Sequence, residues 1–384
     1  MVVDTEGFRL FVGTMVTGRI TADLPVSSLK WGLRLNDAGS IELALPVRAQ
    51  EYQRLNLRAN TAGLRQFVGI SYNGIILECG PIWKRSYDAG NEILKITAAG
   101  LWSILDTVKA LPWYAMAKDT SPTEVTLSVV GKTLGSIARE FVRISIETNP
   151  KNPGLPIVLP DIVPDGTNER NIPGYTLPWL GDLLRNLTGV KRGPDIRFRP
   201  EFVPEDTRFM HWVMEHGTVD NPLLAQSGPD WVWNAAAPKS TVSAISYTED
   251  ATRMAARAYQ PGAGSELDMK LRFADDTTLI DTAGYPWTEI DIASKDVEDL
   301  ALLQEYADAG IAGAKYPIET WTVNVRADER PALGSYLPGH WARIVVPEDH
   351  PFILGGPVRT RILAVDGDDT NNVKLTLAPI QGRP

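Results

Sequence analysis

The stretch Leu29-Lys30-Trp31-Gly32-Leu33-Arg34-Leu35-Asn36-Asp37-Ala38-Gly39-Ser40-Ile41 decides the fold class of this chain. From Leu29 to Leu35, apolar side chains alternate with polar or small ones, which is the period of a half-buried β-strand. Residues 36–39 are turn formers that tolerate positive φ, and the alternation resumes at Ile41. The stretch therefore predicts a β-hairpin.

Two more hairpins follow in the same part of the chain. One is centred on Asn73-Gly74, the pair preferred in a type I′ turn, and the other on the turn at residues 88–91. Three hairpins within about 70 residues predict a barrel or a sandwich. Strands are also expected near the C-terminus, at residues 321–326, 341–346, 358–366 and 373–377, the last two forming a hairpin.

Four helices are expected between these β-regions. The clearest covers residues 134–142, with Thr133 as N-cap and an apolar stripe at helical spacing. A short helix that begins with residues 100–105 and stops near Pro112 would cap the first barrel, and another is expected at 177–187 with Thr176 as cap. The last is expected at 295–309, between a cap at Ser294 and a stop at Gly310.

The last hairpin of the first β-region resembles the last hairpin of the chain. Residues 80–97 and 356–376 both begin with Gly-Pro and both return through an apolar-Lys-apolar-Thr segment. Either this is coincidence, or the chain carries two related barrels that each close with the same hairpin. We expect a mainly β (α+β) fold with a few short helices: a barrel with its capping helix at 1–130, a helical and mixed region at 131–235, and a second barrel region at 236–384.

Composition excludes several classes of protein. Of 384 residues, 43% are hydrophobic and 22% charged, which is an ordinary globular mixture, and the net charge of −9 argues against a general nucleic-acid or anionic-membrane binder. The single cysteine, Cys79, allows no intramolecular disulfide. No apolar run is long enough to span a bilayer, and the first residues lack the pattern of a signal peptide, so we expect a protein that is not secreted.

The negative charge is concentrated in one window. Residues 275–310 contain ten acidic residues and one base, so this window alone carries the net charge of −9. It could be a solvated helix face with its flanking loop, or an acidic wall that faces a channel or a basic partner. The candidate channel-facing acids are Asp275, Asp276, Asp281, Glu289 and Asp291.

No catalytic or metal-binding motif is recognisable. His211 and His216 are five positions apart and so do not share a helix face as zincin ligands do, and the segment from Asp366 lacks the glycine and glutamate of an EF-hand loop. Two convergent carboxylates could still meet in space. We expect no enzyme activity and no cofactor or metal, with a cell-wall hydrolase as the remaining alternative.

The tryptophans are candidate anchors of a core or of a subunit interface. The chain has 11 of them, and the five singled out lie in expected strands or in the capping helix. They are Trp31, Trp83, Trp102, Trp321 and Trp341. A sugar-binding platform would also use tryptophans, but it would expose them in a row.

Three groups of residues resemble one family. Residues 31–41, Gly80-Pro81-Ile82-Trp83 and Ala99-Gly100-Leu101-Trp102 look like the N-terminal barrel of minor tail proteins from long-tailed phages of actinobacteria. Residues 339–344 with 367–377 resemble the closing barrel of the same baseplate-hub proteins, and residues 251–257 with 262–264 resemble their middle part.

The resemblance implies a structural virion protein: a homotrimeric hub at the tail tip, assembled in the host cytoplasm, that joins the tail tube to the distal tip. Its partners would be itself, distal tail or tail-tube proteins and other tail-tip proteins. Phage DNA would pass through it without specific binding. Three chains with two barrels each would present six barrels to a six-fold tail tube. A receptor- or carbohydrate-binding tail protein, or a tail-associated cell-wall hydrolase, is the alternative.

Overall fold

A computed structural model describes residues 7–25, 28–47, 54–112, 121–147, 151–163, 166–190, 192–264, 266–292 and 297–379. The chain divides into two compact units. The first combines 1–188, 194–245 and 322–384, and the second combines 189–193 and 246–321. The boundaries expected at 130/131 and 235/236 both lie inside the first unit. Strands make up 43% of the structure and helices 18%, so the mainly β fold class is confirmed.

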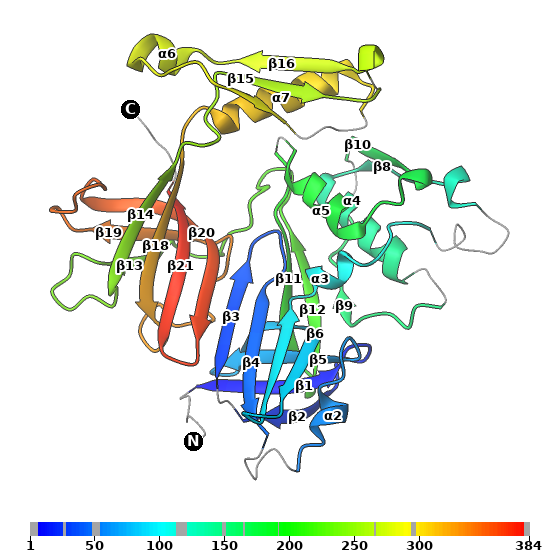
Figure 1. Ribbon diagram of the computed structural model, residues 1–384, viewed down its shortest axis with the longest axis vertical. Helices are drawn as coiled ribbons and strands as arrows, with labels where there is room; N and C mark the ends of the chain where they lie inside the picture. The colour runs from blue at the N-terminus through cyan, green and yellow to red at the C-terminus, as the bar shows by residue number, and fades with distance from the viewer. Residues whose placement is uncertain are drawn as a thin grey trace. The chain divides into compact units, whose positions relative to one another are not determined.

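A six-strand arrangement occurs twice in the chain (Figure 1). The first copy has the sheet order β3-β4-β7-β6-β5-β1, with β2 beyond β1. Its strands are β1 (Phe8–Thr14), β2 (Ile20–Leu24), β3 (Leu29–Arg34), β4 (Ser40–Pro46), β5 (Gln66–Tyr72), β6 (Ile75–Asp88) and β7 (Ile93–Ala99).

The second copy has the sheet order β14-β18-β21-β20-β19-β13. Its strands are β13 (Trp231–Asn234), β14 (Ala244–Asp250), β18 (Ile318–Arg326), β19 (Trp341–Val346), β20 (Gly356–Asp368) and β21 (Asn372–Pro379). Strands at equivalent places in the two sheets also follow one another in the same order along the chain. The second unit takes in most of β14, the start of β18 and the segment 251–317 between them, where the first copy has only the short turn between β3 and β4.

The two copies share a register shift as well as the strand order, although β1 pairs antiparallel with β5 and β13 pairs parallel with β19. The pairing shifts between Ile82 and Lys84 where β6 runs beside β7, and between Ile362 and Ala364 where β20 runs beside β21. In both copies the residue after this bulge lies opposite a threonine of the returning strand. The apolar-Lys-apolar-Thr segments of β7 and β21 are therefore structurally equivalent.

Two expectations need correction. Gly356 opens β20, whereas Gly80 and Pro81 lie in the middle of β6, so the two Gly-Pro pairs are not equivalent positions. Within the residues that the structure describes, the strand order is also a branched path that ends at β14, β13 and β2, and not a ring. The two related β-structures are present, but neither is a closed barrel. Each hairpin predicted from the sequence is confirmed by its antiparallel pairing.

A mixed layer lies between the two copies in the sequence. Its strands are β8 (Thr126–Lys132), β9 (Ile157–Val158), β10 (Asn168–Pro173), β11 (Ile196–Val203) and β12 (Asp206–His216). The helices of the first unit are α2 (Leu57–Asn60), α3 (Trp102–Leu105), α4 (Leu134–Val142) and α5 (Leu180–Thr188), with short turns at Pro122–Glu124, Arg143–Glu147 and Gly174–Thr176. Apolar residues of α4, α5 and β8 form one core around Trp102.

The second unit is a small α/β element. Its sheet order is β16 (Leu271–Asp275), β15 (Arg257–Pro261), β17 (Glu289–Asp291), and its helices are α6 (Thr278–Ala283), α7 (Leu300–Ala314) and the turn Glu266–Asp268. Ile311 and Ala314 of α7 pack with Ala258 of β15 and Ile290 of β17, so α7 covers one face of this sheet. No helix in the described part of the chain has the length and apolar character needed to cross a bilayer.

Candidate functional site

The five candidate tryptophans do not form one site. Trp31, Trp102 and Trp321 are buried, with 2–3% of their surface exposed, and Trp341 is half-buried. Trp83 is 37% exposed and donates to Ser103 Oγ at 2.8 Å. Three of the five are thus core residues of the single chain, and they do not make an exposed row.

The structure brings three of the five candidate acids together. Asp275, Glu289 and Asp291 lie on β16 and β17, both of which pair with β15. Because successive strand residues point to opposite faces, and their neighbours Ala274 and Ile290 pack toward α7, these acids lie on the other face of the sheet. That face also carries Tyr259, whose hydroxyl donates to Glu289 Oε1 at 3.1 Å.

Two of the acids are neutralised by basic partners. Asp275 forms an ion pair with Arg257 (2.6 Å), whose hydrogen bonds lower the pKa of Asp275. Asp276 forms an ion pair with Lys315 (2.7 Å), and hydrogen bonds from Lys315 and Thr278 lower the pKa of Asp276 to about 2. Asp281 accepts a hydrogen bond from Thr277 and is exposed. The window therefore exposes less free negative charge than its sequence indicates.

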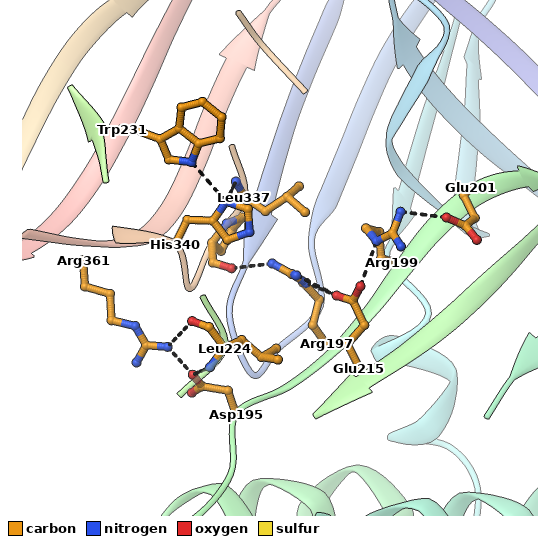
Figure 2. Close-up of polar contacts among 11 residues, drawn as sticks. Asp195, Arg197, Arg199, Glu201, Glu215, Leu224, Trp231, Leu337, His340 and Arg361 are labelled. Atoms are coloured by element: carbon orange, nitrogen blue, oxygen red, sulfur yellow. Dashed lines mark hydrogen bonds and ion pairs between the residues drawn. The ribbon is translucent and has the colours of Figure 1, made fainter. Parts of the chain in front are cut away.

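The densest polar network of the first unit involves residues that sequence reasoning missed (Figure 2). Arg197 and Arg199 project from β11 and share Glu215 on the neighbouring strand β12, with N–O distances of 2.6 and 3.0 Å. Arg199 also pairs with Glu201 at 2.7 Å, and Glu201 in turn contacts His211 Nε2 at 3.0 Å. Because cross-strand neighbours point the same way, this ladder covers one face of the β11–β12 hairpin.

The network connects this hairpin to the second six-strand copy. Arg361 of β20 forms an ion pair with Asp195, and Asp195 also accepts the backbone N–H of Leu224 at 2.8 Å. On the other side, Arg197 donates to the Pro338 carbonyl at 2.8 Å. Asn36, from the first hairpin of the chain, donates to Asp195 Oδ1 at 3.0 Å. Side chains from three distant parts of the sequence meet at Asp195.

Burial and charge fix the protonation states here. Burial opposes ionisation of Glu215, but Arg197 and Arg199 outweigh burial and hold its pKa below the usual value. Burial, helped by Arg197, lowers the pKa of His340 to about 4. His340 is therefore neutral near pH 7, and its Nδ1 accepts hydrogen bonds from Trp231 Nε1 (3.2 Å) and from the Leu337 N–H (3.3 Å).

A hollow of about 800 Å³ adjoins this network and is lined in part by Arg199, Glu215, Trp231 and His340. Its charged groups are already paired within the chain, so the arrangement fits a structural role better than ligand capture. His211 and His216 lie on strand β12 at an odd separation and so face opposite ways. Within the described ranges, no three histidine, cysteine or acidic residues are grouped as metal ligands.

Sequence reasoning missed this network because its partners lie far apart in the chain. The one available signal was the alternation of Arg197, Arg199 and Glu201 along a strand, which places all three on one face. Nothing local identifies Glu215 or Arg361 as their neighbours.

No protein-family model and no curated protein sequence matches this chain. Solved structures of tail proteins do match it over nearly its whole length. A tail protein from Neisseria meningitidis MC58 is 15% identical with a TM-score of 0.54, covering 98% of this chain and 97% of its own. The 43 kDa tail protein of prophage MuSo2 from Shewanella oneidensis is 11% identical with a TM-score of 0.56, covering 97% and 98%. A prophage tail protein from Listeria monocytogenes EGD-e is 12% identical with a TM-score of 0.50, covering 98% and 95%. At these identities the likeness establishes a shared fold.

Proposed function

We propose that this chain is a structural protein of a phage tail, and specifically a homotrimeric hub at the tail tip. The observation that carries the proposal is the fold shared with three tail proteins over at least 95% of each chain. The hub would join the tail tube to the distal tip of a long-tailed phage, as the resemblance to actinobacterial phage proteins implies. Its partners would be itself and other tail proteins, and its place would be the virion.

The internal repeat supports a role as an adaptor. Each chain contains the same six-strand arrangement twice, with matching order and a matching bulge. Three such chains would offer six similar surfaces to a six-fold tube, while the second unit, inserted only in the second copy, would repeat three times. Such an assembly would combine six-fold and three-fold features.

We propose further that the acidic face of the second unit lines the channel through which DNA leaves. Asp275, Glu289 and Asp291 share one sheet face, and Arg257 neutralises only the first of them. A lumen that attracted phosphates would retard the genome, since each basic contact adds salt-dependent affinity. Carboxylates near the duplex would instead repel it, over a range of about 8 Å at physiological ionic strength.

The channel proposal is tested by charge reversal in the phage. We expect Glu289→Lys with Asp291→Lys to slow DNA ejection several-fold while tails still assemble, because the new bases would bind phosphates. The matched control is Glu169→Lys, an exposed acid of the first unit on β10. Ejection kinetics unchanged by the β17 pair would overturn the channel role, and a tail reconstruction with one or six copies of the chain would overturn the trimeric hub.

We also propose that the chain has no hydrolase activity and uses no cofactor. A glycosidase needs two convergent carboxyl groups, one of them free to donate a proton. Glu201 and Glu215, which line the hollow, are each ion-paired with arginine (Figure 2). Release of soluble fragments from purified host cell walls by the purified protein would contradict this proposal.

A further inference from the structure

One strand of the second copy is paired more completely than its equivalent in the first. The end of β20 lies between β21 and β3, and Ala364 to Asp368 pair antiparallel with Arg34 to Lys30. This contact joins the two copies within the chain. It is matched in charge, because Arg34 forms an ion pair with Asp366 at 2.7 Å and Lys30 lies opposite Asp368.

The equivalent segment of the first copy has an unpaired edge. The common bulge aligns Ala364 with Lys84, so the segment of β20 that β3 covers corresponds to residues 84–88 of β6. This segment pairs with β7 on one side, and its side chains are exposed. Among the residues that the structure describes, no backbone group hydrogen-bonds to its other edge.

The strand that could cover this edge is identified by the repeat itself. In the first copy β3 is the strand next to β4, and in the second copy the strand in that place is β14, next to β18. β3 extends its own copy and also covers β20 of the other copy, whereas β14 ends the strand order. We propose that β14 of a second copy of this chain adds to β6 along residues 84–88, as β3 adds to β20 within one chain.

The charges of the two edges support this choice of partner. If β14 takes the place of β3, Asp250 at the end of β14 lies opposite Lys84, just as Arg34 at the end of β3 lies opposite Ala364. Glu249 then lies opposite Arg85. Within the chain the joining strand is basic and its receiving edge acidic. Between chains the joining strand β14 is acidic and the receiving edge of β6 is basic. The basic strand β3 is therefore repelled by the edge of β6, and the acidic strand β14 is repelled by the edge of β20.

The contact is heterologous, because β14 and the β6 edge are different surfaces of the same chain, and repeated contacts of this kind build a ring or a filament. It deepens the proposed function, since a ring that closes after three chains would hold six copies of the six-strand arrangement. Two experiments test the strand contact and the number of chains in the ring separately.

The first test cross-links the two edges. In a chain carrying Lys84→Cys and Asp250→Cys, a short bismaleimide should join neighbouring chains into covalent species that end at three on a denaturing gel. The native Cys79 is buried, so the parent chain, which has no other cysteine, gives the background of the cross-linking reaction. A chain carrying Lys84→Cys and Glu169→Cys, an exposed acid on β10, should stay monomeric on the gel.

The second test reverses the charges. We expect Lys84→Glu alone and Asp250→Lys alone each to weaken self-association about tenfold in analytical ultracentrifugation, since each places like charges opposite one another. The two together should restore it to within about threefold of the parent chain.

If the chain forms trimers that the bismaleimide does not cross-link and that Lys84→Glu does not weaken, the strand contact is overturned and the trimeric hub stands. Covalent species that continue beyond three chains would support the strand contact and overturn the trimeric hub. A chain that stays monomeric at every concentration, with no cross-linking, would overturn both.

Discussion

Glu78 is a buried carboxyl whose chemistry is strongly changed by its surroundings. It is 7% exposed, and its Oε1 accepts the Cys79 N–H at 2.9 Å. Burial raises the pKa of Glu78 from 4.5 to about 8, although the Cys79 N–H and Arg34 oppose the rise. Gly39 packs so closely that a Cβ there would lie 1.8 Å from Glu78 Oε2. The carboxyl is therefore protonated near pH 7 and enclosed by backbone.

This pKa predicts a pH-dependent stability that Glu78→Gln removes. Between pH 4.5 and about pH 8 the unfolded chain loses this proton and the folded chain keeps it. The free energy of unfolding therefore falls as pH rises, by about 1.4 kcal/mol for each unit of pKa difference. We expect the glutamine variant to gain stability relative to the parent chain between pH 5 and pH 8 in urea titrations. Glu42→Gln, an exposed acid on β4, should show no such gain, and an equal slope for parent and Glu78→Gln would contradict the prediction.

At the scale of elements, helix starts depend on which residue accepts the first free N–H groups. Thr133 accepts the Ser136 N–H and caps α4, as the sequence predicts. Thr176 does not cap α5, which begins at Leu180; its hydroxyl donates to Pro173, and Leu177 adopts φ 45°. The expected cap Ser294 and start Lys295 lie outside the described residues, and the helix found there, α7, is capped by Asp299.

The two threonines give a paired prediction. Thr133→Ala should lower the free energy of unfolding by about 1 kcal/mol, because it leaves a helix N–H without its acceptor. Thr176→Ala should change it by less than about 0.5 kcal/mol, since its exposed hydroxyl bonds only to a nearby carbonyl. Chemical denaturation of both variants measures the difference. A larger loss for Thr176→Ala than for Thr133→Ala would show that the cap assignment is wrong.

The sequence places the end of α7 too early. Gly310 was expected to stop the helix, but α7 continues to Ala314. A Cβ on Gly310 would lie 2.0 Å from Ile292 Cδ1, so the glycine leaves room for the side chain of Ile292, which directly follows β17. A packing requirement across the unit, which nothing in the neighbouring sequence reveals, explains this glycine.

At the scale of the molecule, the second unit is an insertion into a hairpin position. It leaves from β14 and returns into β18, and these strands are neighbours: the Ser243 N–H donates to the Asn324 carbonyl at 2.9 Å. The equivalent strands of the first copy, β3 and β4, are joined by a short turn. The six-strand arrangement thus does not require the insertion.

This arrangement predicts that the insertion can be removed. In a chain where residues 251–317 are replaced by Asn-Gly, β14 and β18 keep their full lengths and form an ordinary hairpin. We expect it to remain monodisperse and to unfold cooperatively, with near-UV circular dichroism that reports the buried tryptophans of the first unit. Loss of cooperative unfolding would contradict the equivalence of the two copies. The same chain should still cross-link through residues 84 and 250.

The sequence alone determined what depends on neighbouring residues. Alternation and turn chemistry identified the hairpins that include Trp31, Asn73 and Asp366, and the capping pattern identified α4, because side-chain period and positive-φ turns are local properties. The sequence also identified one part of the internal repeat, the apolar-Lys-apolar-Thr segments that lie in β7 and β21.

Only the tertiary structure decided which distant edges and charges meet. It placed β20 against β3, brought Arg361 to Asp195, and neutralised Asp275 and Asp276 with bases that a count along the chain cannot assign. It also separated buried from exposed tryptophans. The physical reason is that a strand edge or a carboxylate can be satisfied by many partners of the right kind. Which one it receives depends on the packing of the whole unit.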